Sequence, residues 1–288
     1  MFFAAWKRSI KDMLNRKEFI FAFTVSVLFI MIPMFIDMFT YYNTDIMFLK
    51  PAWFYWGVNG IGYESGGNYY GYMYNVSWTI KIFNFCVLPF IVSLTYSYCY
   101  YDDNKNGILK ILIPITGRKN YYLSNALTIF LSGFFIAFLP LLLEQLVLFI
   151  FCPINTPFMI SRLPIADDYI SGIGKTSYNL ESLRLNYPYL FNLLYCIIPS
   201  VTGGLMALLS YSVSLFTRKS RFLILTAPAI MWIVIPFLIT NTGMHSINLN
   251  FFIQPQDTFF DWIWLTVILM VINTAAICSK LLFLKDEI

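Results

Sequence analysis

Residues 121–152, YYLSNALTIFLSGFFIAFLPLLLEQLVLFIFC, form a long, predominantly apolar stretch with one acidic residue, Glu144, and no basic residue. A helix rises about 1.5 Å per residue and the hydrocarbon core of a bilayer is about 30 Å thick, so about 20 apolar residues can cross it. The stretch therefore predicts a membrane-spanning helix that is long enough to tilt or to begin among the lipid headgroups.

Five further apolar stretches predict membrane spans at residues 19–40, 76–99, 189–216, 222–240 and 259–284. Of the 288 residues, 59% are hydrophobic and only 12% are charged, whereas globular proteins average about 25% charged residues. Such a chain cannot supply the charged surface of a water-soluble domain of this length. We therefore expect an all-α, polytopic membrane protein: a single transmembrane domain, residues 1–288, with six membrane-spanning helices.

The first 16 residues, MFFAAWKRSIKDMLNR, have the pattern of an amphipathic helix. One helical face carries Phe2, Trp6, Ile10 and Met13, and the opposite face carries Lys7, Arg8, Lys11 and Asn15. This pattern predicts an interfacial helix that lies along the inner leaflet in contact with membrane lipid, with a transit peptide as the alternative. A cleavable signal peptide is not expected, because basic and apolar residues are interleaved and no small-residue cleavage site follows.

Lysine and arginine residues predict the orientation of the chain. Fourteen of the 19 lie near the two termini, in the 100–120 segment or in the 217–221 segment. The remaining five flank the other ends of the spans, and they are Lys50, Lys81, Arg162, Lys175 and Arg184. Because cytoplasmic loops carry the excess of positive charge, both termini are expected in the cytoplasm, which agrees with six spans. The expected location is the cell (plasma) membrane.

Residues that carry catalysis or bind metal ions are sparse. The chain has one histidine, His245, and five cysteines without a Cys-x-x-Cys pair. Cysteines within apolar stretches are most often small buried hydrophobic residues. Serine–histidine arrangements and paired carboxylates at helical spacing are also missing from the sequence. We expect no enzymatic activity of the chain itself, no bound cofactor or metal ion, and no nucleic-acid partner.

Two ionisable residues fall inside the predicted spans. Glu144 lies eight residues from the outer end of its span, and Lys81 lies five residues from the outer end of the 76–99 span. At about 1.5 Å per residue their depths differ by about 4–5 Å, so the two side chains can pair. One interpretation is a proton relay or a polar contact for a substrate. The other is a structural ion pair, or a lysine that snorkels to the headgroups.

The segment between the second and third spans, YYDDNKNGILKILIPITGRKNYY at residues 100–122, combines polar and apolar residues. Its apolar part predicts a short helical face that Pro114 ends, followed by Arg118 and Lys119 at the return to the membrane. That face consists of Ile108, Leu109, Ile111 and Leu112. It can dock into the groove of another protein, pack against the spans of its own chain, or lie among the headgroups. The residues alone favour none of these.

The layout resembles the membrane subunit of the type-2 ABC exporter family, the ABC-2 permeases. In that family an interfacial helix precedes six spans, and the loop between the second and third spans carries acidic residues, a glycine, an apolar helix, a proline and a basic residue. The matching residues here are Asp102, Asp103, Gly107, Ile108, Leu109, Ile111, Leu112, Pro114 and Arg118. The resemblance implies that this helix is a coupling helix that docks on a separate ABC ATPase subunit.

The resemblance extends to residues 241–259, which resemble the short re-entrant outer helices of the family. The sequence departs from the family at Asn125, which stands where the family often has a basic residue early in the third span. The expected function is the permease subunit of an ATP-driven exporter, paired with a second permease subunit, alike or different. ATP would bind only to the partner ATPase. The few charges within the spans favour an amphiphilic substrate, such as an antimicrobial peptide, a drug or a lipid.

Two other functions remain open at this point. One is a secondary, ion-coupled transporter, which would use an ion gradient rather than ATP. The other is an immunity or scaffold membrane protein that transports nothing and depends on no ATPase.

Overall fold

The computed structural model describes residues 2–44, 83–152, 186–217, 220–234 and 259–282, together with residues 52, 154 and 183. Within these ranges all regular structure is helical and no strand is present. The helices are α1 (Phe2–Leu14), α2 (Lys17–Thr44), the π-helix η3 (Phe83–Val87), α5 (Leu88–Thr95), α6 (Cys99–Lys105), α7 (Leu109–Thr116), α8 (Arg118–Phe151), α11 (Pro188–Phe216), α12 (Arg221–Ala229), the π-helix η5 (Ile230–Val234) and α14 (Phe259–Leu282).

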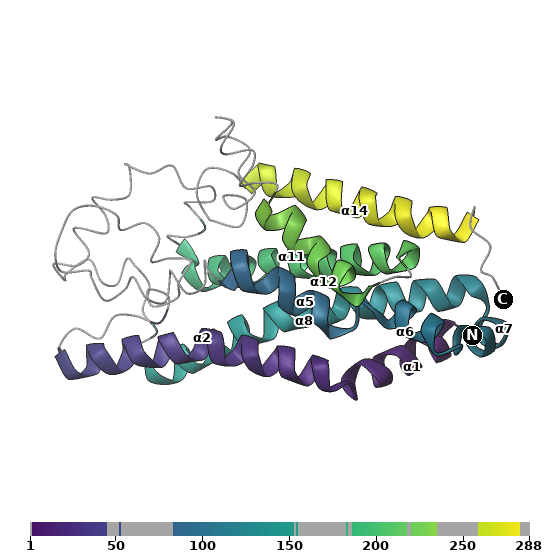
Figure 1. Ribbon diagram of the computed structural model, residues 1–288. Coiled ribbons are helices and arrows are strands. Elements are labelled where there is room, and N and C mark those ends of the chain that lie inside the picture. Colours follow the sequence, from purple (N-terminus) through teal and green to yellow (C-terminus); the bar gives the residue numbers. More distant parts are fainter. Residues whose placement is uncertain are drawn as a thin grey trace.

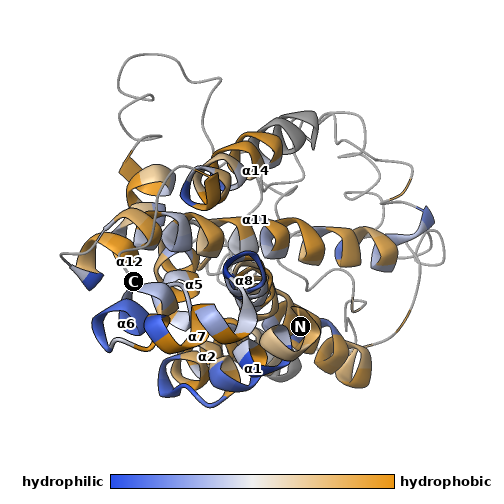
Figure 2. Cartoon of the chain, turned by 90° about the vertical axis from the view of Figure 1, so that its right-hand side faces the viewer, coloured by the Kyte–Doolittle hydropathy of each residue, from blue (hydrophilic) through white to orange (hydrophobic). Residues whose placement is uncertain are grey.

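The long helices lie side by side, and α11 runs between α8 and α14 (Figure 1). Helices α1, α6 and α7 gather at one end of the bundle, where the C-terminal end of α14 also lies. We call this the α7 end. Seen from that end, hydrophilic residues concentrate on α6, on α1 and on the first turn of α8, whereas the long helices are mostly hydrophobic (Figure 2).

Among the described residues, three helices are long and apolar enough to cross a membrane: residues 17–36 of α2, and the whole of α8 and α11. These correspond to the spans predicted at residues 19–40, 121–152 and 189–216. Two apolar helical segments are shorter, Arg221–Val234 and Thr266–Leu282. The spans predicted at 76–99 and 222–240 lie partly outside the described residues, as does the end of the 259–284 span. The chain is thus a membrane protein with several apolar helices, and the six-span arrangement stays a prediction.

Glycine residues bring α8 and α11 into close contact. A Cβ atom added to Gly133 of α8 would lie 2.7 Å from the carbonyl oxygen of Gly203 and 2.8 Å from the Cβ of Ala207, both on α11. A Cβ on Gly204 would lie 2.8 Å from the Phe130 ring. Real Cβ atoms do not approach this closely, so only glycine lets the two backbones meet. Small residues at the crossing are typical of helix pairs in membranes.

Polar side chains add specific links between the apolar helices. Asn192 of α11 donates its amide to Gln145 Oε1 of α8 at 2.9 Å. Asn273 of α14 accepts from Ser212 Oγ at 3.0 Å and donates to the Leu205 carbonyl at 3.1 Å. Hydrogen bonds of this kind contribute on average about 0.6 kcal/mol in membrane helices, so they select the pairing rather than drive it.

Two expected helix boundaries were wrong. The second span was predicted to be continuous to residue 99, but α5 ends at Thr95 and a turn precedes α6. Pro114 was predicted to end the short helix, but α7 continues to Thr116. Proline removes an N–H group and displaces the carbonyl one turn earlier, that of Lys110. Both residues are exposed, so water can satisfy that carbonyl. Gly117, with φ +80°, ends the helix instead.

Candidate docking and coupling site

Helix α7 divides the predicted docking residues between two faces. Leu109, Leu112 and Ile113 are buried in the core of the chain, with exposed fractions of 7–8%. Ile111 and Ile115 point away from that core, and their exposed fractions are 63% and 66%. The two exposed isoleucines are four residues apart, so they lie one above the other on the same side of the helix. The structure therefore leaves a narrow apolar face on the outside of α7.

The other residues of the predicted docking set have different places. Gly107 lies in the turn between α6 and α7 with φ +72°, a conformation that glycine adopts readily. Ile108 is half-buried just before α7, and Pro114 is exposed on it. Of the large apolar side chains predicted to dock, only Ile111 is exposed. Ile115, which shares its face, was not selected from the sequence, although its position one helical turn later was a usable signal.

Arg118, the last residue of the predicted docking set, connects two helices. It is the first residue of α8, and its Nη2 donates a hydrogen bond to the carbonyl oxygen of Lys280 at 2.8 Å. Lys280 lies in the last turn of α14, with its Nζ 5.4 Å from the centre of the Tyr100 ring. Carbonyls in the last turn of a helix have no partner within the helix, so an arginine donor is well placed there. Arg118 thus fastens the start of α8 to the end of α14.

A charged cluster lies beside α7, on the preceding helix α6. Asp102 forms two ion pairs: its Oδ2 is 3.3 Å from Arg16 Nη1, and its Oδ1 is 2.5 Å from Arg221 Nη2. The Asp102 side chain is 14% exposed, compared with 22% for Arg16 and 55% for Arg221. We call Asp102, Arg16, Arg221 and Tyr98 the Asp102 junction. It joins three elements that are remote in sequence: the α1–α2 connection, α6 and the start of α12.

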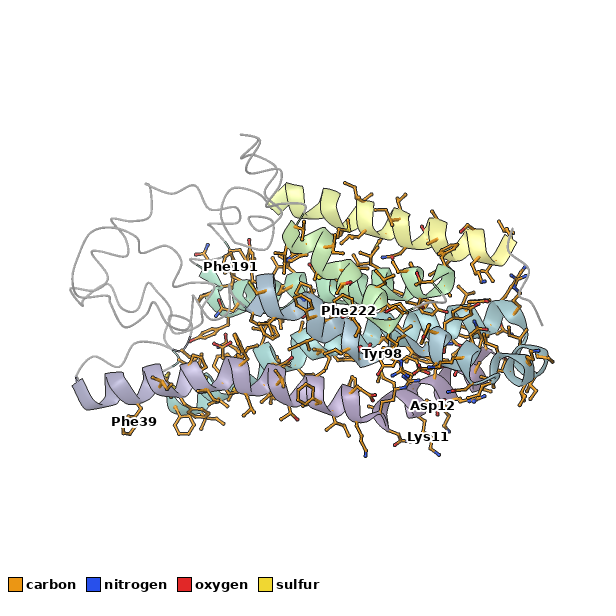
Figure 3. The ribbon with its side chains drawn as sticks, in the orientation of Figure 1. Lys11, Asp12, Phe39, Tyr98, Phe191 and Phe222 are labelled. Carbon is orange, nitrogen blue, oxygen red and sulfur yellow. The ribbon has the colours of Figure 1, made fainter. Side chains whose placement is uncertain are left out.

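Aromatic rings pack against the arginines of the Asp102 junction. The Arg16 guanidinium carbon lies 4.8 Å from the centre of the Tyr96 ring and 5.2 Å from that of Tyr98. Arg221 lies 5.2 Å from the same Tyr98 ring, so one tyrosine contacts both arginines. Figure 3 shows Tyr98 pointing in among the helices, whereas Lys11 and Asp12 on α1 point outward. The turn that interrupts the predicted second span supplies these rings, which gives the break a structural reason.

Two further contacts fix neighbouring helices at the same end. The Tyr121 hydroxyl of α8 donates to Asp103 Oδ2 of α6 at 2.5 Å. Ser9 of α1 donates to Asn125 Oδ1 of α8 at 2.7 Å, with both side chains buried. Burial raises the pKa of Asp103 above its ordinary value, and the Tyr121 hydrogen bond partly opposes this shift. Helix α1 therefore packs on α8 through a polar contact, with Ala5, Ser9 and Met13 as its buried residues.

The Asp102 junction was not found from the sequence. Arg16 and Arg221 entered the sequence analysis only as charges that orient the chain, and Asp102 only as part of the resemblance. The pairs span 86 and 119 positions of the sequence, and no local periodicity connects them. One usable signal was scarcity: with 12% charged residues, each arginine next to a membrane span has few possible acidic partners.

Of the two ionisable residues predicted inside the spans, Glu144 lies among the described residues and Lys81 does not. Glu144 lies in α8 and is fully buried, next to Gln145, which accepts the hydrogen bond from Asn192. Lys81 lies outside the described residues, so the Glu144–Lys81 pair stays a prediction. Within the described ranges, no three His, Cys, Asp or Glu side chains come together in a group that could hold a metal ion.

Comparison of the chain with protein families, with characterised proteins and with solved structures finds no match.

Proposed function

We propose that this chain is the membrane-spanning permease subunit of an ATP-driven exporter of the ABC-2 type. Two permease subunits, alike or different, form the path for an amphiphilic substrate such as an antimicrobial peptide, a drug or a lipid. Separate ATPase subunits hydrolyse ATP. In this proposal the chain crosses the cell membrane several times, and the α7 end faces the cytoplasm because most lysines and arginines flank the spans there.

The observation that carries the proposal is the outward face of α7. Ile111 and Ile115 expose about two-thirds of their surface at the α7 end, where the hydrophilic residues of α1 and α6 gather. Fully burying one isoleucine side chain contributes about 1.5–3 kcal/mol. An apolar groove on a partner protein would gain about two-thirds of this from each residue, because each is already about one-third buried. Short amphipathic helices are generally recognised in this way. The opposite face of α7 packs against the core of the chain, so Ile111 and Ile115 are oriented outward.

Substitution of the two exposed isoleucines tests the proposal. The chain is co-expressed with an ABC ATPase subunit that restores ATP-dependent export, and Ile111→Asp and Ile115→Asp are compared with the unchanged chain. A carboxylate in an apolar groove costs several kcal/mol unless it is paired, so both variants should lose the ATPase on co-purification and lose ATP-dependent export. The amount of chain in the membrane should be unchanged, because neither side chain is buried.

Ile154→Asp is the matched control. Ile154 follows α8 at the opposite end of the bundle, and its exposed fraction of 62% is close to that of Ile111. This variant should keep the ATPase. If the two α7 variants also keep the ATPase and export at the normal rate, α7 is not the docking helix.

An ion-coupled carrier is the second candidate, and the buried carboxyl of Glu144 favours it. Ionisable residues inside membrane helices are costly and often mark transport pathways. In vesicles that contain the chain without an ATPase, a carrier would transport when an ion gradient is imposed, and Glu144→Gln would abolish this transport. An exporter would need ATP and its partner subunit, whereas an immunity or scaffold protein would transport under neither condition.

A further inference from the structure

We infer that Asp102 is a positioning residue that transmits movement of α7 to the membrane-spanning helices. Its two ion pairs join α6 to the cytoplasmic-side ends of α2 and α12. This inference rests on the proposed function, because it assumes that a partner moves α7. It adds a role for residues that lie outside the exposed Ile111–Ile115 face of α7.

The first step of the argument is that α6 and α7 move together. A turn of only three residues joins them, and backbone hydrogen bonds close it: Asn106 N to Asp102 O at 2.9 Å, Gly107 N to Asn104 O at 3.2 Å and Lys110 N to Gly107 O at 3.3 Å. Asp102 itself accepts the first of these bonds. A displacement of α7 therefore acts directly on the residue that carries the two ion pairs.

The second step is where the ion pairs lead. Arg16 is the residue immediately before α2, the helix that extends along the whole bundle to Phe39 and beyond (Figure 3). Arg221 is the first residue of α12, whose N-cap Ser220 accepts a hydrogen bond from the Phe222 N–H. Both arginines are thus attached to the first turn of a helix. A displacement of Asp102 therefore displaces the first turns of α2 and α12, and both of these helices are remote from α6 in the sequence.

The third step is that the junction can be displaced as a unit. Tyr98 contacts both arginines, so a single ring links the two ion pairs of Asp102. The junction is partly exposed at Arg221 and nearly buried at Asp102. Hydrogen bonds between charged groups are roughly twice as strong as neutral ones, so the two pairs on the Asp102 carboxylate resist separation when α6 moves.

Spin labels at the far end of the bundle test the inference without knowledge of the substrate. Cysteines are introduced by Phe39→Cys at the end of α2 and Tyr187→Cys just before α11, both exposed positions. The exposed native thiols are removed by Cys86→Ser and Cys278→Ser. In the complex with its ATPase, ATP should change the distance between the two labels. With Asp102→Asn the ATPase should remain bound and hydrolyse ATP, and the distance change should be lost.

Three comparisons make the result specific. Asp102→Glu, which keeps the carboxylate, should restore the ATP-dependent distance change. Asp12→Asn, the same chemical change in an exposed pair with Arg8 on α1, should leave it intact. Labels on Lys105→Cys and Phe222→Cys in the chain alone should report one distance between α6 and α12, which broadens when Asp102→Asn is added.

The possible failures are distinct. If ATP moves no label in the otherwise unchanged complex, or no ATPase binds, the proposed function itself fails. If ATP still moves the far labels in the Asp102→Asn complex, the junction does not transmit the movement and the inference is overturned. The inference is also overturned if the α6–α12 distance in the isolated chain is indifferent to Asp102→Asn.

Discussion

The α8–α11 crossing and the Asp102 junction hold helices together by different physical means. At the crossing, Gly133 and Gly203 let two backbones meet, so the contact consists of many short-range packing interactions with no charge. At the junction, one carboxylate holds two guanidinium groups above tyrosine rings. Packing of the first kind tolerates almost no change of shape. The ion pairs of the Asp102 junction tolerate movement of their helices but depend on charge. This suits an end of the bundle that is proposed to shift.

The largest expected effect comes from filling the glycine crossing. Gly133→Leu places a side chain where even a Cβ atom would be 2.7 Å from the Gly203 carbonyl oxygen. Overpacking of a core commonly costs about 1–3 kcal/mol, and a clash with backbone that cannot rotate away lies at or above the upper end. We expect loss of folded protein, measured as the monodisperse fraction in detergent and the thermal unfolding midpoint.

Leu127→Ala, a change at a partly exposed position of the same helix, is the control for this variant. It should keep the normal unfolding midpoint. A stable Gly133→Leu protein would show that the two helices can separate at the crossing, and the contrast between the two regions would then be lost.

The second prediction compares substitutions on the buried face and on the exposed face of α7. Leu112→Asp buries a carboxylate in the core and should lower the free energy of unfolding by about 3 kcal/mol or more. Ile111→Asp, one residue away and 63% exposed, should change it by less than about 0.5 kcal/mol. Thermal unfolding in detergent measures both. Equal losses would show that Ile111 also packs within the folded chain.

Leu112 and Ile111 also show which features of the fold can be predicted from the sequence. Apolar length identified α2, α8 and α11 to within four residues at each end, because a long apolar stretch has few alternatives in a bilayer. The short helix near residues 108–114 was also recognised. Its orientation was not, since residues 108, 109, 111, 112, 113 and 115 are all apolar and together cover more than half of the helical circumference. Which of them faced inward depended on the surfaces of α8 and its neighbours.

The Asp102 junction and the glycine crossing illustrate the remaining limit. Glycine occurs at 14 positions, and nothing local marks Gly133 and Gly203 as partners. Their contact follows from the way two whole helices cross. In the same way, the pairing of Asp102 with Arg16 and Arg221 requires the α1–α2 connection and the start of α12 to converge on α6. Such contacts are properties of the assembled bundle, whereas the spans are properties of their own residues.

The smallest expected effect is a pH dependence of the folding stability, and it concerns Asp103, which lies at the α7 end. Burial raises the pKa of the folded-state carboxyl above its unfolded value of about 3.9. The groups that act on it are Tyr121, Arg16, Arg8 and Asp12. Because the folded state holds the proton more tightly, the stability that this group contributes is fully present below the unfolded pKa. It is lost as the pH rises through the folded pKa.

Asp103→Asn removes this titration while keeping an acceptor for the Tyr121 hydroxyl. The stability of the unchanged protein relative to Asp103→Asn should therefore fall as the pH is raised from about 4 towards neutrality, as measured by thermal unfolding at a series of pH values. The damage caused by Gly133→Leu should be the same at every pH, because no titratable group takes part in the glycine crossing. A pH-independent difference for Asp103→Asn would mean that Asp103 ionises in the folded chain as readily as in the unfolded one. Charge would then distinguish the two regions only at Asp102 and its arginines.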